Sequence, residues 1–299
     1  MSLLSWRAWY ELLRETFAEW QRDNCLRLGA ALAFYTLLSL APLLMVTIAI
    51  VALVFGDDFA HGEVMGRVES LVGAEAAATL REMVERASQP RSGLLATAIG
   101  LAMSALGASG VFGQLQQALN DIWDVRPAPG RGWRGLVAGR VRAFSMLLLI
   151  GFLIVVSLGA GAAVTALAEQ IGKLFPGALV TARIADLLTS FGVTALLFAL
   201  LFKVLPDLSI RWSDVAVGAA VSAGLFAVGR LGIAWYLGRA SGASVYGAAG
   251  SLIVLLLWIY YSSQLLFFGA EFTQVYARRH GSLRPEAGAG SLPSAPVPR

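Results

Sequence analysis

The last hydrophobic segment, Ser244 to Tyr276, most constrains what this chain can fold into. It reads SVYGAAGSLIVLLLWIYYSSQLLFFGAEFTQVY and holds one ionisable acid, Glu271, near its far end. An α-helix rises about 1.5 Å per residue, so about 20 mainly apolar residues cross a hydrocarbon core of about 30 Å. The segment therefore predicts a membrane-spanning helix. At about 48 Å when fully helical, it is long enough to tilt or to project beyond the bilayer.

The composition supports further spans before this one. The chain is 57% hydrophobic and 14% charged, whereas an ordinary soluble domain is about 45–50% apolar and about 25% charged. We therefore expect an all-α integral membrane protein with six transmembrane helices. The predicted spans are 29–55, 93–113, 143–168, 184–204, 214–237 and 244–276.

Three segments outside the spans have their own character. Residues 1–28 carry apolar side chains at helical spacing, and this face predicts an interfacial N-terminal helix. We expect no cleavable signal peptide in this segment. Residues 57–91 predict two amphipathic helices that break at Gly73 and form an outer cap. Residues 277–299 are rich in Gly, Ser, Pro and Ala and predict a disordered tail. The apolar face of the N-terminal helix comprises Trp6, Trp9, Leu13, Phe17 and Trp20.

The distribution of basic residues predicts the orientation. Six spans place both termini on one side, and that side collects fifteen Lys and Arg residues against seven on the other. Loops rich in Lys and Arg stay in the cytoplasm. We therefore expect cytoplasmic N- and C-termini.

Pro42 lies inside the first span, where it removes one backbone donor. Such a helix usually bends, and a nearby hydroxyl such as that of Ser39 can satisfy a freed backbone group. At the end of the extension that follows the second span, Asn120, Asp121 and Trp123 predict a helix end anchored at the cytoplasmic face.

Arg230 is the deepest charge in the predicted spans, about 12 Å below the outer end of span five. A charge at this depth is costly unless it is paired, and Asp186, about 6 Å down span four, lies at the best matching depth. Two interpretations remain open. Arg230 either snorkels or pairs to fix helix packing, or it binds an anionic headgroup with Asp186 beside it.

Glu271 lies about 37 Å along span six, near the inner face, where it could meet Lys203 at the inner end of span four. Two roles for Glu271 remain open: its carboxylate either serves helix packing or exchanges protons. The single cysteine, Cys25, excludes an intrachain disulfide and a multi-cysteine metal site.

Several motifs together resemble those of the YihY/BrkB family of multi-pass bacterial inner-membrane proteins. They are ALAFYTLLSLAPLL in the first span, LNDIWDV after the second, KVLPD after the fourth and YGAAGSLIVLLLWIYYSSQLLFFGAEF in the sixth. The resemblance implies a six-helix inner-membrane protein with cytoplasmic termini. It also implies a link to virulence in some members and, in others, passage of a lipid or lipopolysaccharide precursor.

Many members of that family carry a ribonuclease BN label. Here His61 and His280 lie on opposite predicted sides of the membrane, and no carboxylate and histidine cluster has metal-ligand spacing. We therefore expect no catalytic residues, no cofactor, no metal and no nucleic-acid partner. The preferred function is transport of an amphipathic, anionic lipid-type substrate; a membrane scaffold for envelope assembly is the alternative, and a ribonuclease comes last. The oligomeric state stays open.

Overall fold

Most of the apolar segments fold as helices in the computed structural model, which describes only part of the chain. The predicted spans 93–113 and 143–168 lie mostly outside the described residues, as does the predicted tail beyond residue 283. The structure describes residues 6–88, 110–125, 178–208, 210–239 and 250–283, and positions 145, 149, 152, 153, 155, 156 and 159.

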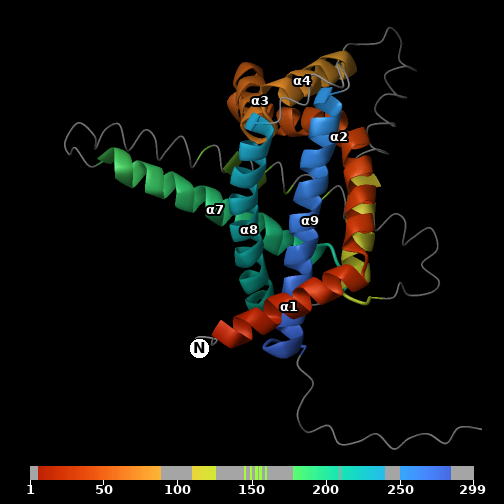
Figure 1. The fold of residues 1–299 in the computed structure, drawn as a ribbon. Coiled ribbons are helices and arrows are strands. Elements are labelled where there is room, and N and C mark those ends of the chain that lie inside the picture. Colours follow the sequence, from red (N-terminus) through yellow and green to blue (C-terminus); the bar gives the residue numbers. More distant parts are fainter. Residues whose placement is uncertain are drawn as a thin grey trace, which may run out of the picture.

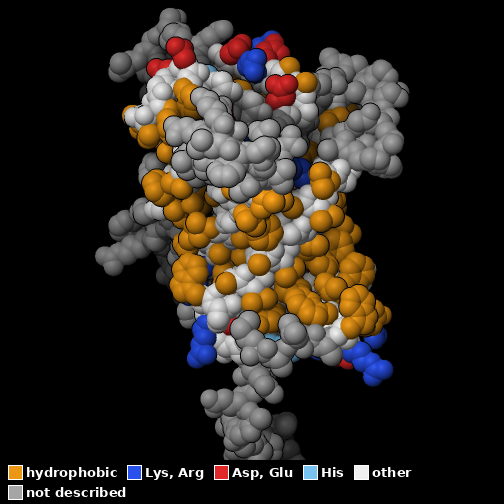
Figure 2. All heavy atoms as spheres, turned by 90° about the vertical axis from the view of Figure 1, so that its left-hand side faces the viewer, with side chains coloured by type: hydrophobic (Ala, Val, Ile, Leu, Met, Phe, Trp, Pro, Cys, Tyr) orange, Lys and Arg blue, Asp and Glu red, His pale blue; other side chains and the backbone are white. Residues whose placement is uncertain are grey.

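Four helices in the described part are long and apolar enough to cross a membrane. Figure 1 shows α2, α8 and α9 running alongside one another, while α7 crosses them at a steep angle with its first half pointing away from the bundle. On the face that Figure 2 shows, hydrophobic side chains cover the middle of the molecule as a belt, and charged side chains gather at its two ends. The four helices are α2 (Cys25–Phe55), α7 (Ala178–Val204), α8 (Trp212–Arg239) and α9 (Gly250–Arg279).

The helices extend past the predicted spans. Helix α2 begins four residues before residue 29 and continues through Pro42, and Ser39 beside it is buried. Helix α9 ends at Arg279, three residues beyond the predicted end. Ion pairs with α1 hold this last turn: Arg279 contacts Glu15, and Arg278 lies 3.5 Å from Glu19.

Helix α1 (Trp6–Arg22) lies across one end of the bundle (Figure 1). It packs on α9 through the fully buried Leu12, while Leu13 and Phe17 of the predicted apolar face are exposed. Trp9 belongs to both faces and stacks on Phe272 with ring centroids 6.0 Å apart. The helix therefore has a second, packed face, and the predicted apolar face stays available to the bilayer interface.

At the opposite end of the bundle lie α3 (Asp57–Val72) and α4 (Ala74–Ser88) (Figure 1). Gly73 separates them with a φ of 86°, a value that favours glycine because it lacks a Cβ. Leu80 and Val84 of α4 are buried in one cluster with residues of α2, α3 and α9. The two helices and the break between them agree with the sequence; their placement on the outer side of a membrane stays a prediction.

Helices α8 and α9 are joined by small residues that fit against polar ones. A methyl group added at Gly218 would overlap Thr273, and one added at Gly269 would overlap Ser222. Ser222 and Thr273 each donate their hydroxyl to the carbonyl one turn earlier in their own helix. Such close backbone approach is how helices associate when lipid offers no hydrophobic driving force.

Candidate functional site: an apolar cavity beside Arg230

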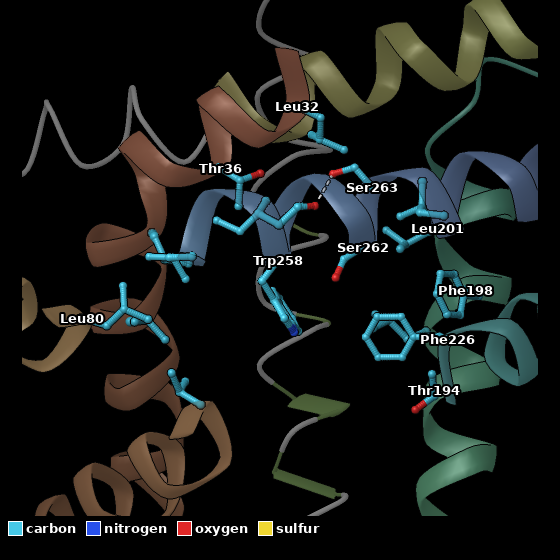
Figure 3. Close-up of a pocket in the computed structure, with 17 residues that line it drawn as sticks. Leu32, Thr36, Leu80, Thr194, Phe198, Leu201, Phe226, Trp258, Ser262 and Ser263 are labelled. Carbon is cyan, nitrogen blue, oxygen red and sulfur yellow. Dashed lines mark hydrogen bonds between the residues drawn. The ribbon is translucent and has the colours of Figure 1, made fainter. Parts of the chain in front are cut away.

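A cavity of about 450 Å³ lies between α2, α7, α8 and α9, and Val68 of α3 and Leu80 of α4 also line it. Its walls are almost entirely apolar because the spanning helices carry Leu, Phe and Trp on the faces that meet there. Trp258 and Phe226 stand on two sides of the space with Ser262 between them (Figure 3). The polar side-chain groups in the wall are the indole N–H of Trp258 and the hydroxyls of Thr36, Thr194, Ser262 and Ser263.

Arg230 lies next to this cavity. It lines a narrow cleft between α8 and α9, and Phe226, Trp258 and Ser262 border both the cleft and the cavity. Tyr261 approaches the backbone of α8 there, because a methyl group at Gly229 would meet the Tyr261 hydroxyl at 2.8 Å. The Arg230 side chain is exposed and forms no ion pair with any described residue. Arg230 therefore lies beside the apolar cavity, with three residues shared between the cleft and the cavity.

Asp186, the predicted partner of Arg230, belongs to α7. Its side chain is outside the described part of the structure, so the pairing stays a prediction. Figure 1 shows the first half of α7 diverging from α8, the helix that carries Arg230.

A buried polar layer lies near the end of the bundle that carries α1. Asn120 and Asp207 form a reciprocal contact: the Asn120 amide donates to the Asp207 carboxylate at 3.3 Å, and the Asp207 backbone N–H donates to Asn120 Oδ1 at 2.9 Å. Gln116 adds a hydrogen bond to the same carboxylate at 3.4 Å. This ties the helical segment 110–122 to the turn between α7 and α8.

The same segment is held from α9. The Gln274 side-chain amide donates to the carbonyl of Ile122 at 2.5 Å, where the segment ends. Trp123 is buried at this end, Asp121 is exposed, and Asp124 adopts a positive φ of 53°. The predicted helix end is therefore where the sequence places it, and Asn120 also joins it to the rest of the bundle.

Glu271 is fully buried within this layer. The Cys25 thiol donates to its Oε1 at 3.5 Å, and its Oε2 has no hydrogen-bond partner among the described residues. Asp23 lies close to it, in the turn between α1 and α2. Burial, reinforced by the nearby carboxylate of Asp124, raises the pKa of Asp23.

Lys203 has other neighbours than Glu271. Its ammonium group donates to the carbonyl of Ile210 and lies 5.7 Å above the centre of the Trp212 ring. The described contacts of Glu271 are with Cys25 and Asp23 instead. The two residues predicted to form one charge site thus have separate partners.

The sequence did not single out three residues of the polar layer: Asp207, Gln274 and Asp214. Asp214 is buried and accepts hydrogen bonds from the Ser282 backbone N–H at 2.8 Å and from its hydroxyl at 2.6 Å. The sequence does mark Asp207 as a turn residue, because it ends the KVLPD motif directly after Pro206. A polar residue at a turn is too common to single out from one sequence.

His61 lies on α3 and His280 follows α9, at opposite ends of the bundle. Among the described residues, no group of three or more His, Cys, Asp or Glu side chains is arranged to hold a metal ion.

These features define a helical membrane protein whose long apolar helices enclose an apolar cavity and a separate buried polar layer. The chain belongs to the family described as virulence factor BrkB, which it matches over residues 16–291. The resemblance inferred from the sequence motifs is thereby confirmed.

Several curated relatives are named UPF0761 membrane proteins. The one from Halorhodospira halophila is 30% identical over 264 residues, which are 85% of this chain and 54% of the relative. The one from Alkalilimnicola ehrlichii is 28% identical over 280 residues, which are 90% of this chain and 59% of the relative. The chain thus spans little more than half the length of these relatives. No solved structure matches it.

Proposed function

We propose that this protein transports an amphipathic, anionic lipid-type molecule in the bacterial inner membrane, with its termini in the cytoplasm. The observation that carries the proposal is the apolar cavity that adjoins Arg230. An apolar chain would occupy the cavity, and an anionic headgroup would contact the guanidinium group.

The chemistry of the two parts suits such a molecule. The aromatic and aliphatic walls favour hydrocarbon, because burial of apolar surface contributes about 25 cal/mol per Å². Arginine holds phosphate and carboxylate groups through two parallel hydrogen bonds. An arginine at bilayer depth costs at least about 2.5–3.5 kcal/mol on insertion scales, and contact with an anionic group would offset part of that cost.

Asp186 keeps its proposed role as the residue beside Arg230 that tunes the contact with the headgroup. The proposal assigns no catalytic residue and no cofactor. The positive-inside distribution supports placing α1 on the cytoplasmic side and the cap of α3 and α4 on the outer side.

The test is transport by the full chain reconstituted in liposomes, after mass spectrometry has identified the lipids that copurify with it. Phosphatidylglycerol with a fluorescent acyl chain serves as the probe, and its movement between leaflets is followed by chemical quenching from outside. Arg230→Gln should slow this movement about tenfold or more, the effect of losing a hydrogen bond to a charged group.

The matched control is Arg81→Gln, which removes an exposed arginine from α4. It should leave the rate within about twofold of the unmodified protein, because an isolated exposed charge contributes little. Equal rates in liposomes with and without protein would contradict transport and favour the alternative, a membrane scaffold for envelope assembly.

A further inference from the structure

A second hollow, of about 570 Å³, lies at the α1 end of the bundle, away from the apolar cavity. It is formed where α7 ends, α8 begins and the chain turns after α9. No residue borders both this hollow and the cavity beside Arg230. Its lining residues are Lys203, Ile210, Arg211, Trp212, Ser213, Ser282 and Leu283.

Two cations face this hollow. The ammonium group of Lys203 is fixed by the Ile210 carbonyl and by the Trp212 ring, 5.7 Å away. The Arg211 side chain is exposed and forms no ion pair or side-chain hydrogen bond with any described residue. The ammonium group of Lys203 is therefore held in place, and the N–H groups of the Arg211 guanidinium are available to a ligand.

The carboxylate of Asp214, the second residue after Trp212, is engaged by hydrogen bonds within the protein. Asp214 is buried behind the wall and accepts from Ser213 at 3.2 Å and from the backbone and hydroxyl of Ser282. Among the described residues, no carboxylate lines the hollow itself. The first backbone N–H groups of α8 also lie there, and their dipoles favour an anion.

The surroundings of the hollow are those of a membrane interface. Trp212 is 54% exposed, and Val204 and Leu283 beside it are exposed apolar side chains. Tryptophan prefers the headgroup level of a bilayer, and basic pockets between helices at the cytoplasmic side bind anionic headgroups. A phosphate group with hydrocarbon attached therefore fits better than a free phosphate ion.

We propose that this hollow binds the phosphate group of an anionic phospholipid in the leaflet at the α1 end of the bundle. Lys203 and Arg211 contact the phosphate, and Trp212 lies against the glycerol and upper acyl region. The site is distinct from the transport path proposed above and does not depend on it.

Native mass spectrometry of the full chain in detergent tests this site, with phosphatidylglycerol and phosphatidylcholine of equal acyl chains as probes. Arg211→Gln should weaken phosphatidylglycerol binding about fivefold, the usual effect of one basic residue near an anionic lipid. Phosphatidylcholine binding should not change. Adding Lys203→Gln should weaken phosphatidylglycerol binding further.

The matched control is Arg27→Gln, which removes an exposed arginine near the start of α2 at the same end. An equal loss in this control would show that overall charge attracts the lipid, and it would overturn the site. Unchanged binding in Arg211→Gln would also overturn it. Because Arg211 is exposed and has no described side-chain partner, that variant should fold, which its elution volume and helix content verify.

Two further measurements separate this site from its alternatives. Inorganic phosphate should not displace phosphatidylglycerol, even in excess. If phosphate displaced the lipid at a concentration equal to that of the lipid, the hollow would be a site for soluble phosphate, and the lipid proposal would be overturned. Arg211→Gln should cause the same loss of phosphatidylglycerol binding in an Arg230→Gln background, because the two sites share no residue, so failure here and failure of the proposed transport path are distinguishable.

Discussion

Glu271 places a carboxyl group where neither water nor a described cation reaches it. Glu271→Gln should keep the protein folded, because glutamine has the same size and can still accept from the Cys25 thiol. Glu271→Lys should abolish folded protein, since an unpaired buried ammonium costs several kcal/mol. The yield of monodisperse protein after extraction distinguishes the two; a good yield of Glu271→Lys would contradict the burial of this site.

The raised pKa of Asp23 should make the free energy of unfolding depend on pH. Burial raises its folded pKa, so the unfolded chain ionises first as the pH rises. The stability from this group is present at acidic pH and is lost as the pH rises through the folded value. Asp23→Asn should therefore raise the thermal midpoint at neutral pH and remove the loss of stability that begins as the pH rises above the ordinary pKa of an aspartate, about 3.9.

Thermal unfolding in detergent at several pH values checks this, with Glu85→Gln on the exposed surface of α4 as the control. Parallel pH curves for Asp23→Asn and the unmodified protein would contradict the effect. Asp124 and Glu19 add to the raised pKa of Asp23, while Arg22 and the hydrogen bond to Glu271 oppose it.

Depth along a helix could be predicted from the sequence, but the direction of a side chain around the helix could not. The residue count placed Glu271 and Arg230 at different depths; in the structure Glu271 contacts Cys25, whereas Arg230 lines the cleft with Tyr261. It also suggested Lys203 as the neighbour of Glu271, yet Lys203 contacts Ile210 and Trp212. The angle between helices decides such contacts, and apolar helices carry little sequence signal for it.

Helix α1 illustrates this limit at the level of elements. Its strongest apolar repeat predicts an interface-facing helix, and Trp6, Leu13 and Phe17 of that face are exposed. Its contact with α9 uses Leu12 and Trp9 instead. A helix that lies between the bilayer and the protein has two apolar faces. Sequence periodicity reveals only the face with the more regular apolar repeat. The helix ends were better predicted, because turn and break signals such as Gly73 are local.

Neighbouring leucines in α1 test this assignment. Leu12 is fully buried against α9, whereas Leu13 is 43% exposed. Leu12→Ala should cost about 2–5 kcal/mol, the range for buried leucines, and should lower the thermal midpoint. Leu13→Ala should change it little. A larger effect at Leu13 would mean that the other face of α1 makes the contact.

The contact between α8 and α9 depends on glycine at defined positions. A methyl group at Gly218 would overlap Thr273, whereas at Gly224 no heavy atom lies within 4 Å of the new methyl group. Gly218→Ala should therefore destabilise by about 1–3 kcal/mol, and Gly224→Ala should be neutral or slightly stabilising. Thermal midpoints measured side by side decide this; equal midpoints would contradict the close packing.

For the whole molecule, composition and span length were enough to predict the helical membrane class. The described part contains four helices that fulfil this prediction, and the family match supports it. The cavity could not be predicted in the same way. Its walls come from α2, α7, α8 and α9, with one residue each from α3 and α4, and the apolar wall residues also suit a lipid-facing surface.

The orientation of the molecule is testable with single cysteines in a Cys25→Ser background. Arg14→Cys on α1 and Glu85→Cys on α4 lie at opposite ends of the bundle and are both exposed. In intact spheroplasts, an impermeant thiol reagent should label the α4 position only. Labelling of the α1 position before permeabilisation would reverse the proposed orientation.

The most direct test of the central claim is photo-crosslinking from inside the cavity. A photoreactive phenylalanine analogue at Ser262 should crosslink an anionic phospholipid, whereas one at Leu231, 69% exposed on α8, should crosslink lipids in proportion to their abundance. Mass spectrometry identifies the adducts. Enrichment of anionic lipid at Ser262, lost in Arg230→Gln, is the predicted result. Crosslinks from Ser262 only to the protein's own chain would contradict a lipid-binding cavity.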